Sequence, residues 1–434
     1  MIPLFAALLL AGGHALAPAS DTWPAFRGDG SGHTAAKNLP VTWSPKENIA
    51  WTAKLPGYGQ SSPVVWKGVT YVTAVEGENK EKCIVAAYDT AKGQPLWTKA
   101  FVAAQPSKSG PMVSRAAPTP AINEHGVFAF FDTGNLLHLT PKGDVVWERS
   151  LPKEIGEFKN NHGLASSPVL VGETLVVLVD HQGPSYLLGV DVKTGKDRWK
   201  KDRPSAGSWT SPIALKQGER PVVIISSSGT VTAYDGKTGD LLWTMDGIVG
   251  NNMPSAAVAG KQRFLVGASE AKGNADPATV AKSNCLIELG ETAGKPSLNV
   301  VWTGQKVASS TASPTAAGEQ AYFVDRGGVV TCVSMKNGQM LYKDRLDGTC
   351  WASPIVAGEL IYFFGKDGNT TVIKTGPTFQ KVASNTLFGP AEAPKDGGEK
   401  GGFYPDDSTV YGVAAIDGAF FVRTGTQLIC IRSK

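Results

Sequence analysis

The stretch VVIISSSGTVTAYDGKTGDLLW, from Val222 to Trp243, decides the fold. It reads as an apolar strand, a Ser-rich turn, an alternating strand, an Asp-Gly-Lys-Thr-Gly turn and a last strand that ends in Trp243. With Trp209 to Ile213 just upstream, it predicts a unit of four antiparallel strands. Four such strands bury one face poorly when alone, so the unit requires neighbours.

Related units recur along nearly the whole chain. Each opens on Ser-Pro or an equivalent, passes through two apolar strands and a Gly turn, and ends in an aromatic residue. The expected openings are Ser62-Pro63, Ala117-Pro118, Ser167-Pro168, Ser211-Pro212, Met253-Pro254, Ser313-Pro314 and Ser353-Pro354. The closing aromatic residues are Trp97, Trp147, Trp199, Trp243, Trp302 and Tyr342. This repetition predicts a ring of four-stranded blades.

The repeated Trp has two interpretations. At equivalent positions beside an Asp and a Gly turn, a large flat ring can pack between neighbouring blades while the Asp caps the turn. A ligand-binding role is the alternative. Since a binding site would need each ring in a different place, we expect the architectural role.

The chain ends predict how the ring closes. Ile49 to Ala53 looks like a last strand with no blade before it, whereas the final copy has three strands, Tyr411 to Ala415, Ala419 to Arg423 and Gln427 to Ile431. Pairing them completes an eighth blade and removes the open edges. We therefore expect an all-β, eight-bladed propeller over residues 48–434, with a seven-bladed ring as the alternative.

The N-terminal residues predict export. Residues 1–19 combine an apolar run with small residues before a cleavage point, as in a signal peptide, although an ordinary strand is the alternative. Residues 20–47 form an expected arm pinned to the domain by Trp23, Phe26 and Trp43. No later apolar run approaches the roughly 20 residues of a membrane span. We expect a soluble, monomeric periplasmic or secreted protein without a lipid anchor.

Charge and cysteine content exclude some classes of function. A formal charge of +4 over 434 residues, without a long Lys/Arg block, gives no footprint for nucleic acid. The five cysteines are scattered and form no C-x-x-C pair, so neither a zinc site nor a redox motif is expected. Alternating apolar residues around Cys332 and Cys430 indicate small hydrophobic positions within strands.

The units ending in Trp97, Trp199 and Trp243 resemble the tryptophan-docking repeat of quinoprotein-type (PQQ-like) propellers, over residues 48–434. That family holds quinone-dependent dehydrogenases and non-catalytic propellers such as the BamB lipoprotein, a scaffold in outer-membrane β-barrel assembly. In the dehydrogenases, the resemblance implies a quinone on a Trp, a disulfide between adjacent cysteines, and Ca²⁺ beside an Asp base. Adjacent cysteines and a C-x-x-C-H haem motif are absent here. We therefore expect no cofactor and a BamB-like scaffold, with a quinone-dependent oxidoreductase as the alternative.

Loops that enter the innermost strands are expected to face a central funnel. Their lining residues are Tyr58, Gln60, Arg115, Asn161, His162, Trp209, Asn251, Asn252 and Trp351. Amides, hydroxyls and Trp faces suit a protein, peptide or polysaccharide ligand, or they simply solvate a channel. Asn160 to Gly163 and Asp180-His181 form a histidine-bearing pair of segments, expected at opposite ends of neighbouring strands and without a catalytic or metal role.

Overall fold

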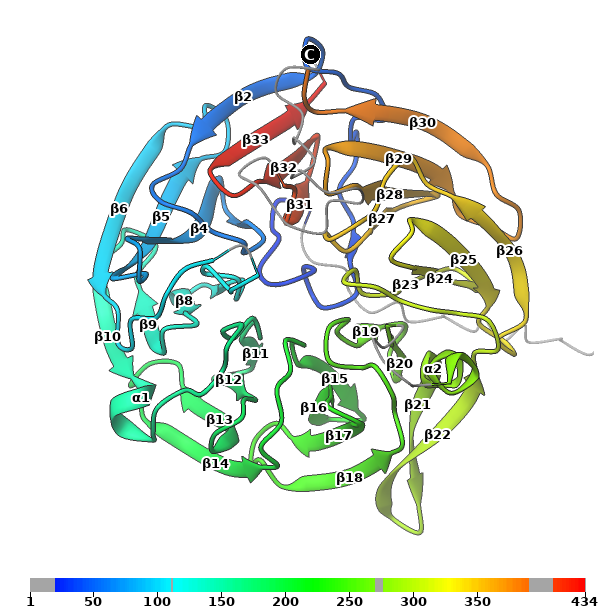
Figure 1. Cartoon of the computed structure of the whole chain (residues 1–434), viewed down its shortest axis with the longest axis horizontal. Coiled ribbons are helices and arrows are strands. Elements are labelled where there is room, and N and C mark those ends of the chain that lie inside the picture. The colour runs from blue at the N-terminus through cyan, green and yellow to red at the C-terminus, as the bar shows by residue number, and fades with distance from the viewer. Residues whose placement is uncertain (1–19, 111, 270–275, 390–408, 434) are drawn as a thin grey trace, which may run out of the picture.

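The computed structural model describes residues 20–110, 112–269, 276–389 and 409–433. The expected signal peptide, residues 1–19, lies outside the described residues. Eight sheets are arranged around a common centre, and the chain proceeds round the ring in sequence order (Figure 1). The prediction of an all-β, eight-bladed propeller is confirmed.

The blades have the following strands. Blades 1 and 2 contain β3 (Val64–Trp66), β4 (Val69–Glu76), β5 (Lys82–Asp89), β6 (Pro95–Val102), then β7 (Ala121–Asn123), β8 (Gly126–Phe130), β9 (Asn135–Leu139), β10 (Val145–Ser150). Blades 3 and 4 contain β11 (Val169–Val171), β12 (Thr174–Val179), β13 (Ser185–Asp191), β14 (Asp197–Arg203), then β15 (Ile213–Gln217), β16 (Arg220–Ser227), β17 (Thr230–Asp235), β18 (Leu241–Asp246). Blades 5 and 6 contain β19 (Ala257–Val258), β20 (Arg263–Val266), β21 (Cys285–Thr292), β22 (Lys295–Thr303), then β23 (Thr315–Ala317), β24 (Gln320–Val324), β25 (Val329–Ser334), β26 (Met340–Arg345).

Blades 7 and 8 also use the N-terminal part of the chain. Blade 7 contains β27 (Ile355–Ala357), β28 (Leu360–Phe364), β29 (Asn369–Lys374) and β30 (Lys381–Thr386), and β1 (His33–Thr34) adds a parallel fifth strand to β27. Blade 8 contains β31 (Gly412–Ile416), β32 (Ala419–Arg423), β33 (Gln427–Arg432) and, as its outer strand, β2 (Ile49–Lys54). The helices are α1 (Leu151–Glu154) and α2 (Pro277–Ser283). Among the described residues, neither helix is long and apolar enough to cross a membrane.

The pairing of β2 with β33 closes the ring, as the sequence predicts. β2 lies antiparallel to β33, with Thr52 opposite Ile429 and Lys54 opposite Gln427. In Figure 1 these strands, from opposite ends of the described chain, lie side by side. Main-chain hydrogen bonds thus remove an open edge on each side of the seam.

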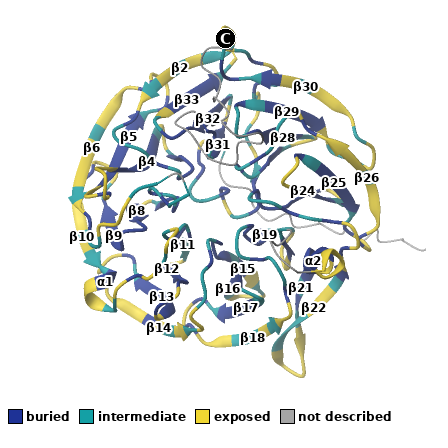
Figure 2. Cartoon of the chain, viewed as in Figure 1, coloured by how far each residue is buried: buried dark blue, intermediate teal, exposed yellow. Residues whose placement is uncertain are grey.

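The core lies between the blades. In β4 and β5, Val72 and Ala86 pack in a cluster with blade 8, whereas Val85 and Ala87 pack in a cluster with blade 2. Because successive strand residues point to opposite faces, each middle strand faces a neighbour on both sides. Figure 2 shows the result, with buried middle strands and an exposed outer rim.

The repeated Trp residues join one blade to the next. The Trp97 indole lies against Gly143 of blade 2 and donates from Nε1 to the Pro141 carbonyl at 3.0 Å. Trp147 and Trp302 make the same contact with the next blade, and Trp51 of the closing strand makes it with Gly93 of blade 1. The architectural role is confirmed, and blade 8 takes part in it.

The Asp beside each Gly turn has the predicted capping role. Asp89 Oδ1 accepts hydrogen bonds from the backbone N–H groups of Ala91 and Lys92, at 2.9 and 2.7 Å. Asp191 and Asp235 do the same in blades 3 and 4. The turns of Gly93, Gly195 and Gly239 are therefore held by carboxylate caps, whereas the hydroxyls of Thr140 and Ser334 accept in the turns of Gly143 and Gly338.

A chain of hydroxyl groups links the starts of the inner strands. In each step, the backbone N–H of one blade donates to the hydroxyl oxygen of the next, at 2.9–3.2 Å, in the order Ser62, Thr119, Ser167, Ser211, Ser255, Ser313, Ser353. The proline that usually follows lacks an N–H group and suits the first position of a strand. At blade 8 the hydroxyl is replaced by Gly412, whose Cα lies against Ser62.

This chain corrects the expected start of two blades. In blade 2 the equivalent of Ser62 is Thr119, two residues beyond the predicted Ala117-Pro118. In blade 5 it is Ser255, not Met253. Both stretches carry a proline just before the true start, which shifted the predicted register.

The Trp contacts can be tested at two glycines with similar backbone angles. Gly143 has φ +87°, and a Cβ there would come 2.8 Å from the Trp97 ring, whereas Gly68 has φ +82° and nothing within 4 Å. Gly68→Ala should lose roughly 1–2 kcal/mol through its left-handed backbone. Gly143→Ala should lose about 1–3 kcal/mol more because it displaces the indole. Equal decreases in Tm for the two variants would contradict the docking interpretation.

The hydroxyl chain predicts a difference between two substitutions of Ser211. Ser211→Ala leaves the buried Ser167 N–H without its acceptor and should cost about 1–3 kcal/mol. Ser211→Thr should cost much less, because Thr119 fills the same role in blade 2. Thermal unfolding of the two variants measures the difference, and similar losses would show that the hydrogen bond contributes little.

All five cysteines are free and buried, and burial raises the pKa of each thiol to about 12. The sequence-based interpretation of Cys332 and Cys430 as small hydrophobic residues within strands is confirmed. We expect a thiol reagent such as Ellman's reagent to modify none in the native protein at pH 8. All five should react after unfolding in denaturant, and rapid native labelling would contradict the buried arrangement.

Candidate functional site

The inner strands begin around a small hollow at one end of the central channel, here called the central cup. Its volume is about 180 Å³. It is lined by Phe26, Gln60, Ser62, Ala117, Thr119, Ala165, Ser167, Trp209, Ser211, Met253, Ser255, Thr311, Ser313 and Tyr411. Hydroxyls of the inner-strand chain thus form much of its wall.

Two of the predicted funnel residues lie on this wall, and each is fixed by hydrogen bonds to a neighbouring loop. Gln60 exchanges two hydrogen bonds with the Arg115 backbone, at 2.8 and 3.0 Å. Trp209 donates from Nε1 to the Gly163 carbonyl and from its backbone to the Asn252 carbonyl, at 3.0 and 2.9 Å. The blade tops are therefore tied together around the cup.

Aromatic rings and a cation gather around Tyr411 of the cup wall, in a cluster here called the mouth of the cup. The Arg115 guanidinium lies 3.3 Å from the centre of the Tyr58 ring, a close cation–π contact. The Tyr58 and Tyr411 hydroxyls are 2.7 Å apart, and the Trp351 ring lies against Tyr411. Tyr411 was missed from sequence because it occupies the blade without a Ser-Pro signal.

A second arginine lies near the tyrosine pair. Arg423 is fully buried and donates to the carbonyls of Thr73 and Thr424. Burial lowers the pKa of Arg423 to about 10, against an opposing effect of Tyr88, Tyr58 and Tyr411. No Asp or Glu lines the cup among the described residues. Hydroxyls, amides and cations together suit a ligand rich in hydrogen-bond acceptors.

The remaining predicted residues have different environments. Asn161 and His162 are exposed, with His162 Nδ1 3.1 Å from the Met112 carbonyl and its ring against Trp209. Asn251 is only 1% exposed and donates to Ser226 and Thr230, so it ties strands of blade 4 together and does not line the cup.

The N-terminal arm lies within the central channel, at the place where the sequence predicts a central funnel (Figure 1). Trp23 pairs with Val65 on the inner edge of blade 1, and the Thr34 hydroxyl lies at the Ala415 carbonyl of blade 8. Phe26 lines both the central cup and a groove at the other end of the channel. The arm therefore divides the channel into two separate hollows.

Arg27 anchors the arm near the axis. Its guanidinium donates to the carbonyls of Ser31, Ala256 and Pro314, at 3.0, 3.3 and 2.7 Å. Burial lowers the pKa of Arg27 to about 10, and Asp29 opposes that effect. One side chain from the arm thus holds blades 5 and 6.

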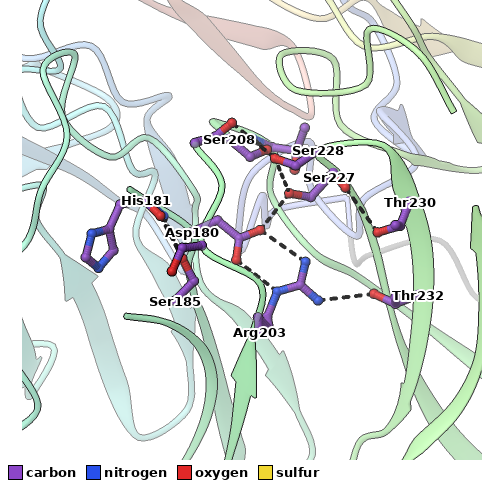
Figure 3. Close-up of polar contacts among 12 residues, drawn as sticks. Asp180, His181, Ser185, Arg203, Ser208, Ser227, Ser228, Thr230 and Thr232 are labelled. Atoms are coloured by element: carbon purple, nitrogen blue, oxygen red, sulfur yellow. Dashed lines mark hydrogen bonds and ion pairs between the residues drawn. The ribbon is translucent and has the colours of Figure 1, made fainter. Parts of the chain in front are cut away.

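The histidine-bearing segments do not form an acid–base pair, although the structure brings them closer than expected. His181 Nδ1 accepts from the backbone N–H of Lys159 at 3.0 Å, so His181 lies beside the residue that precedes Asn160. Asp180 points away from this ring to Arg203 and Ser227 (Figure 3). Asp180 and Arg203 form a buried ion pair, with Nε to Oδ1 at 2.9 Å.

This ion pair is structural. Burial acts to lower the pKa of Arg203, but the hydrogen bonds and charges of Asp180 and Tyr234 together outweigh burial, and the pKa is raised. The pair joins blades 3 and 4 through Ser227, Thr232 and Tyr234. Buried partners hydrogen-bonded in this way hold each other in place.

The residues present do not fit the calcium–quinone arrangement that the dehydrogenase resemblance implies. Among the described residues, no group of three or more His, Cys, Asp or Glu is placed to hold a metal. Hard oxygen ligands are what Ca²⁺ requires, and none of the described residues that form the cup wall is a carboxylate. The five cysteines are unpaired, so no disulfide covers the site.

Comparison with known proteins identifies relatives in sequence. A family model described as "Outer membrane protein assembly factor BamB" matches residues 24–245, 190–284 and 227–378. A curated relative of the same name, from Burkholderia pseudomallei (strain K96243), is 26% identical over 217 residues. Those residues are 49% of this chain and 51% of that protein, so the chain spans about half the length of the curated relative it matches.

Solved structures share the fold. BamB from Moraxella catarrhalis has a TM-score of 0.57 at 14% identity, covering 88% of this chain and 96% of that one. Quinohemoprotein alcohol dehydrogenase from Comamonas testosteroni has a TM-score of 0.60 at 13% identity, covering 97% and 82%. Both identities are low, so these likenesses concern the fold alone.

The family assignment rests on the extent of the sequence match together with the observed repeat. The matched residues run from 24 to 378, which is more than half of the chain, and include the blades with the docked Trp residues. The chain belongs to the PQQ-like propeller family of outer membrane protein assembly factor BamB.

Proposed function

We propose that this chain is a non-catalytic binding module that holds a partner protein at the central cup. The observation that carries the proposal is the mouth of the cup, where Tyr58, Arg115, Trp209, Trp351 and Tyr411 gather around hydroxyls and amides. Aromatic residues and Arg are the side chains that most often dominate binding energy at protein interfaces. No carboxylate lines the cup among the described residues, so it offers recognition groups but no acid–base pair.

The family supports a role in the cell envelope. The matching family model and the curated relative are both called outer membrane protein assembly factor, and we transfer that role to this chain as part of the proposal. The chain would act as an exported scaffold, in the periplasm or secreted.

Fusion of residues 1–40 to alkaline phosphatase lacking its own leader tests export, since the enzyme gains activity only outside the cytoplasm. An inactive fusion would contradict export.

Site-specific photocrosslinking tests the binding role. A benzophenone amino acid at Asn161, exposed beside the cup, should form a discrete adduct with a partner protein in cells. The same group at Leu241, which is 56% exposed on the outer strand β18, is the matched control and should form none. The same adduct from both positions, or none from Asn161, would refute the cup as the binding surface.

Variants of the cup sharpen that test. Combining Trp209→Ala and Trp351→Ala removes two aromatic faces and should reduce the Asn161 adduct at least tenfold, because such residues each contribute about 2 kcal/mol or more at hot spots. The Tm of the double variant must stay well above the temperature of the assay, because Trp209 also donates a hydrogen bond to the Gly163 carbonyl. Adding pyrroloquinoline quinone and Ca²⁺ should neither raise the Tm nor give dye-linked oxidation of alcohols. A raised Tm with turnover would overturn the non-catalytic assignment.

A further inference from the structure

The arm forms one type of hydrogen bond repeatedly with the inner strands. Backbone N–H groups of Val65, Ile122, Val258 and Val356 donate to arm carbonyls of Trp23, Pro24, Gly30 and Gly32, at 2.9, 2.8, 3.2 and 2.9 Å. These donors lie at the second residue of the inner strands of blades 1, 2, 5 and 7. The arm therefore covers these sheet edges as an added strand would.

Blades 3 and 4 present the same position without the arm. Leu170 of β11 lies opposite Leu175, and Ala214 of β15 lies opposite Val223, in the register that Val65 has with Thr70. In antiparallel sheets, such a register directs both the N–H and the C=O away from the paired strand. Within the described residues, no hydrogen bond from the arm reaches either residue.

The arm leaves these two edges because it turns. Gly28 N donates to the Ala25 carbonyl, and Gly30 N and Gly32 N donate to the Arg27 carbonyl, so residues 25–32 fold back on themselves. A groove of about 470 Å³ remains between this turn and blades 2 to 4, and Leu170 and Ala214 line it. It continues into a second hollow of about 1070 Å³ that the same two residues also line.

The first part of this groove is acidic. Asp29, Glu124 and Glu173 line it, and no Lys or Arg does among the described residues. Asp29 accepts a hydrogen bond from Ser31, and Glu173 pairs with Lys193 at 3.0 Å, which lowers the pKa of Glu173. Glu124 is exposed and forms no ion pair within the described part of the chain. The groove thus complements a positively charged group.

We propose that an extended peptide segment carrying a Lys or Arg binds in this groove and adds a short strand to β11 and β15. Backbone carbonyls of the peptide accept hydrogen bonds from the N–H groups of Leu170 and Ala214, and its basic side chain faces Glu124. The arm provides the precedent, because consecutive residues Trp23 and Pro24 pair with the neighbouring blades 1 and 2 in this way. The site lies at the end of the channel opposite the central cup and goes beyond the proposed function.

Defined peptides test the proposal with the whole chain. The probe is acetyl-Val-Lys-Val-Lys-Val-amide, and the charge control is acetyl-Val-Glu-Val-Glu-Val-amide. In protein labelled with ¹⁵N at Leu and Ala, the Lys peptide should move the amide proton signals of Leu170 and Ala214 downfield and saturably. The Glu peptide should bind at least tenfold more weakly. No saturable shift, or equal binding of the two peptides, would overturn the proposal.

Two variants locate the site. Ala214→Pro removes the proposed donor while its neighbours keep their pairing, and should weaken Lys-peptide binding about tenfold. Glu124→Lys should weaken binding of the Lys peptide by a similar factor. Because this substitution leaves the strand unchanged, it still tests the proposal if the proline variant misfolds. Glu319→Lys, the matched charge reversal in the corresponding loop of blade 6, should bind like the native protein.

The remaining outcomes also decide the question. Peptide binding that survives both Ala214→Pro and Glu124→Lys would overturn the proposal. Self-association that Ala214→Pro abolishes would assign the groove to a second copy of the chain and likewise overturn it. Failure of the Asn161 crosslink leaves these peptide shifts unaffected, so the cup and the groove are tested separately.

Discussion

Unpaired sheet edges are the constraint on which this structure depends. Four strands with an open edge on each side form a poor unit, so the chain must bring its own ends together. β2 pairs with β33 across the seam, and Trp51 on β2 docks on Gly93 of the first blade as the other Trp residues dock on their neighbours. One N-terminal strand thus completes both the hydrogen bonding and the side-chain packing of the ring.

The inner edges face the same constraint at the axis, where the arm resolves most of it. Backbone carbonyls of residues 23–32 accept from four inner strands, and Arg27 satisfies carbonyls of blades 5 and 6. Phe26 then separates the central cup from the groove beside blades 3 and 4. Both hollows are therefore products of the path that one short segment takes.

The sequence predicts the ring well because its signals are carried by side chains. Trp, Gly and Asp recur at fixed places in several blades, and the orphan strand at Ile49 indicates the closure. The path of the arm could not be predicted, since its contacts are made largely by backbone groups of a Gly-rich segment. Tyr411 was missed because blade 8 lacks the Ser-Pro signal. Asn251 was misplaced because the sequence does not distinguish a loop amide that hydrogen-bonds to neighbouring strands from one that faces solvent.

The hydroxyl chain has a direction. Every step runs from the N–H of one blade to the oxygen of the next, so the dipoles of these groups follow one another round the axis from Ser62 to Ser353. The sequence of dipoles is interrupted at Gly412, in the same blade where the two ends of the ring are joined by β2. At this junction other hydrogen bonds take the place of the hydroxyl step, from Arg423 to the Thr73 carbonyl and from the Gly59 N–H to the Gly425 carbonyl, so the sector that joins the chain ends has its own set of ties.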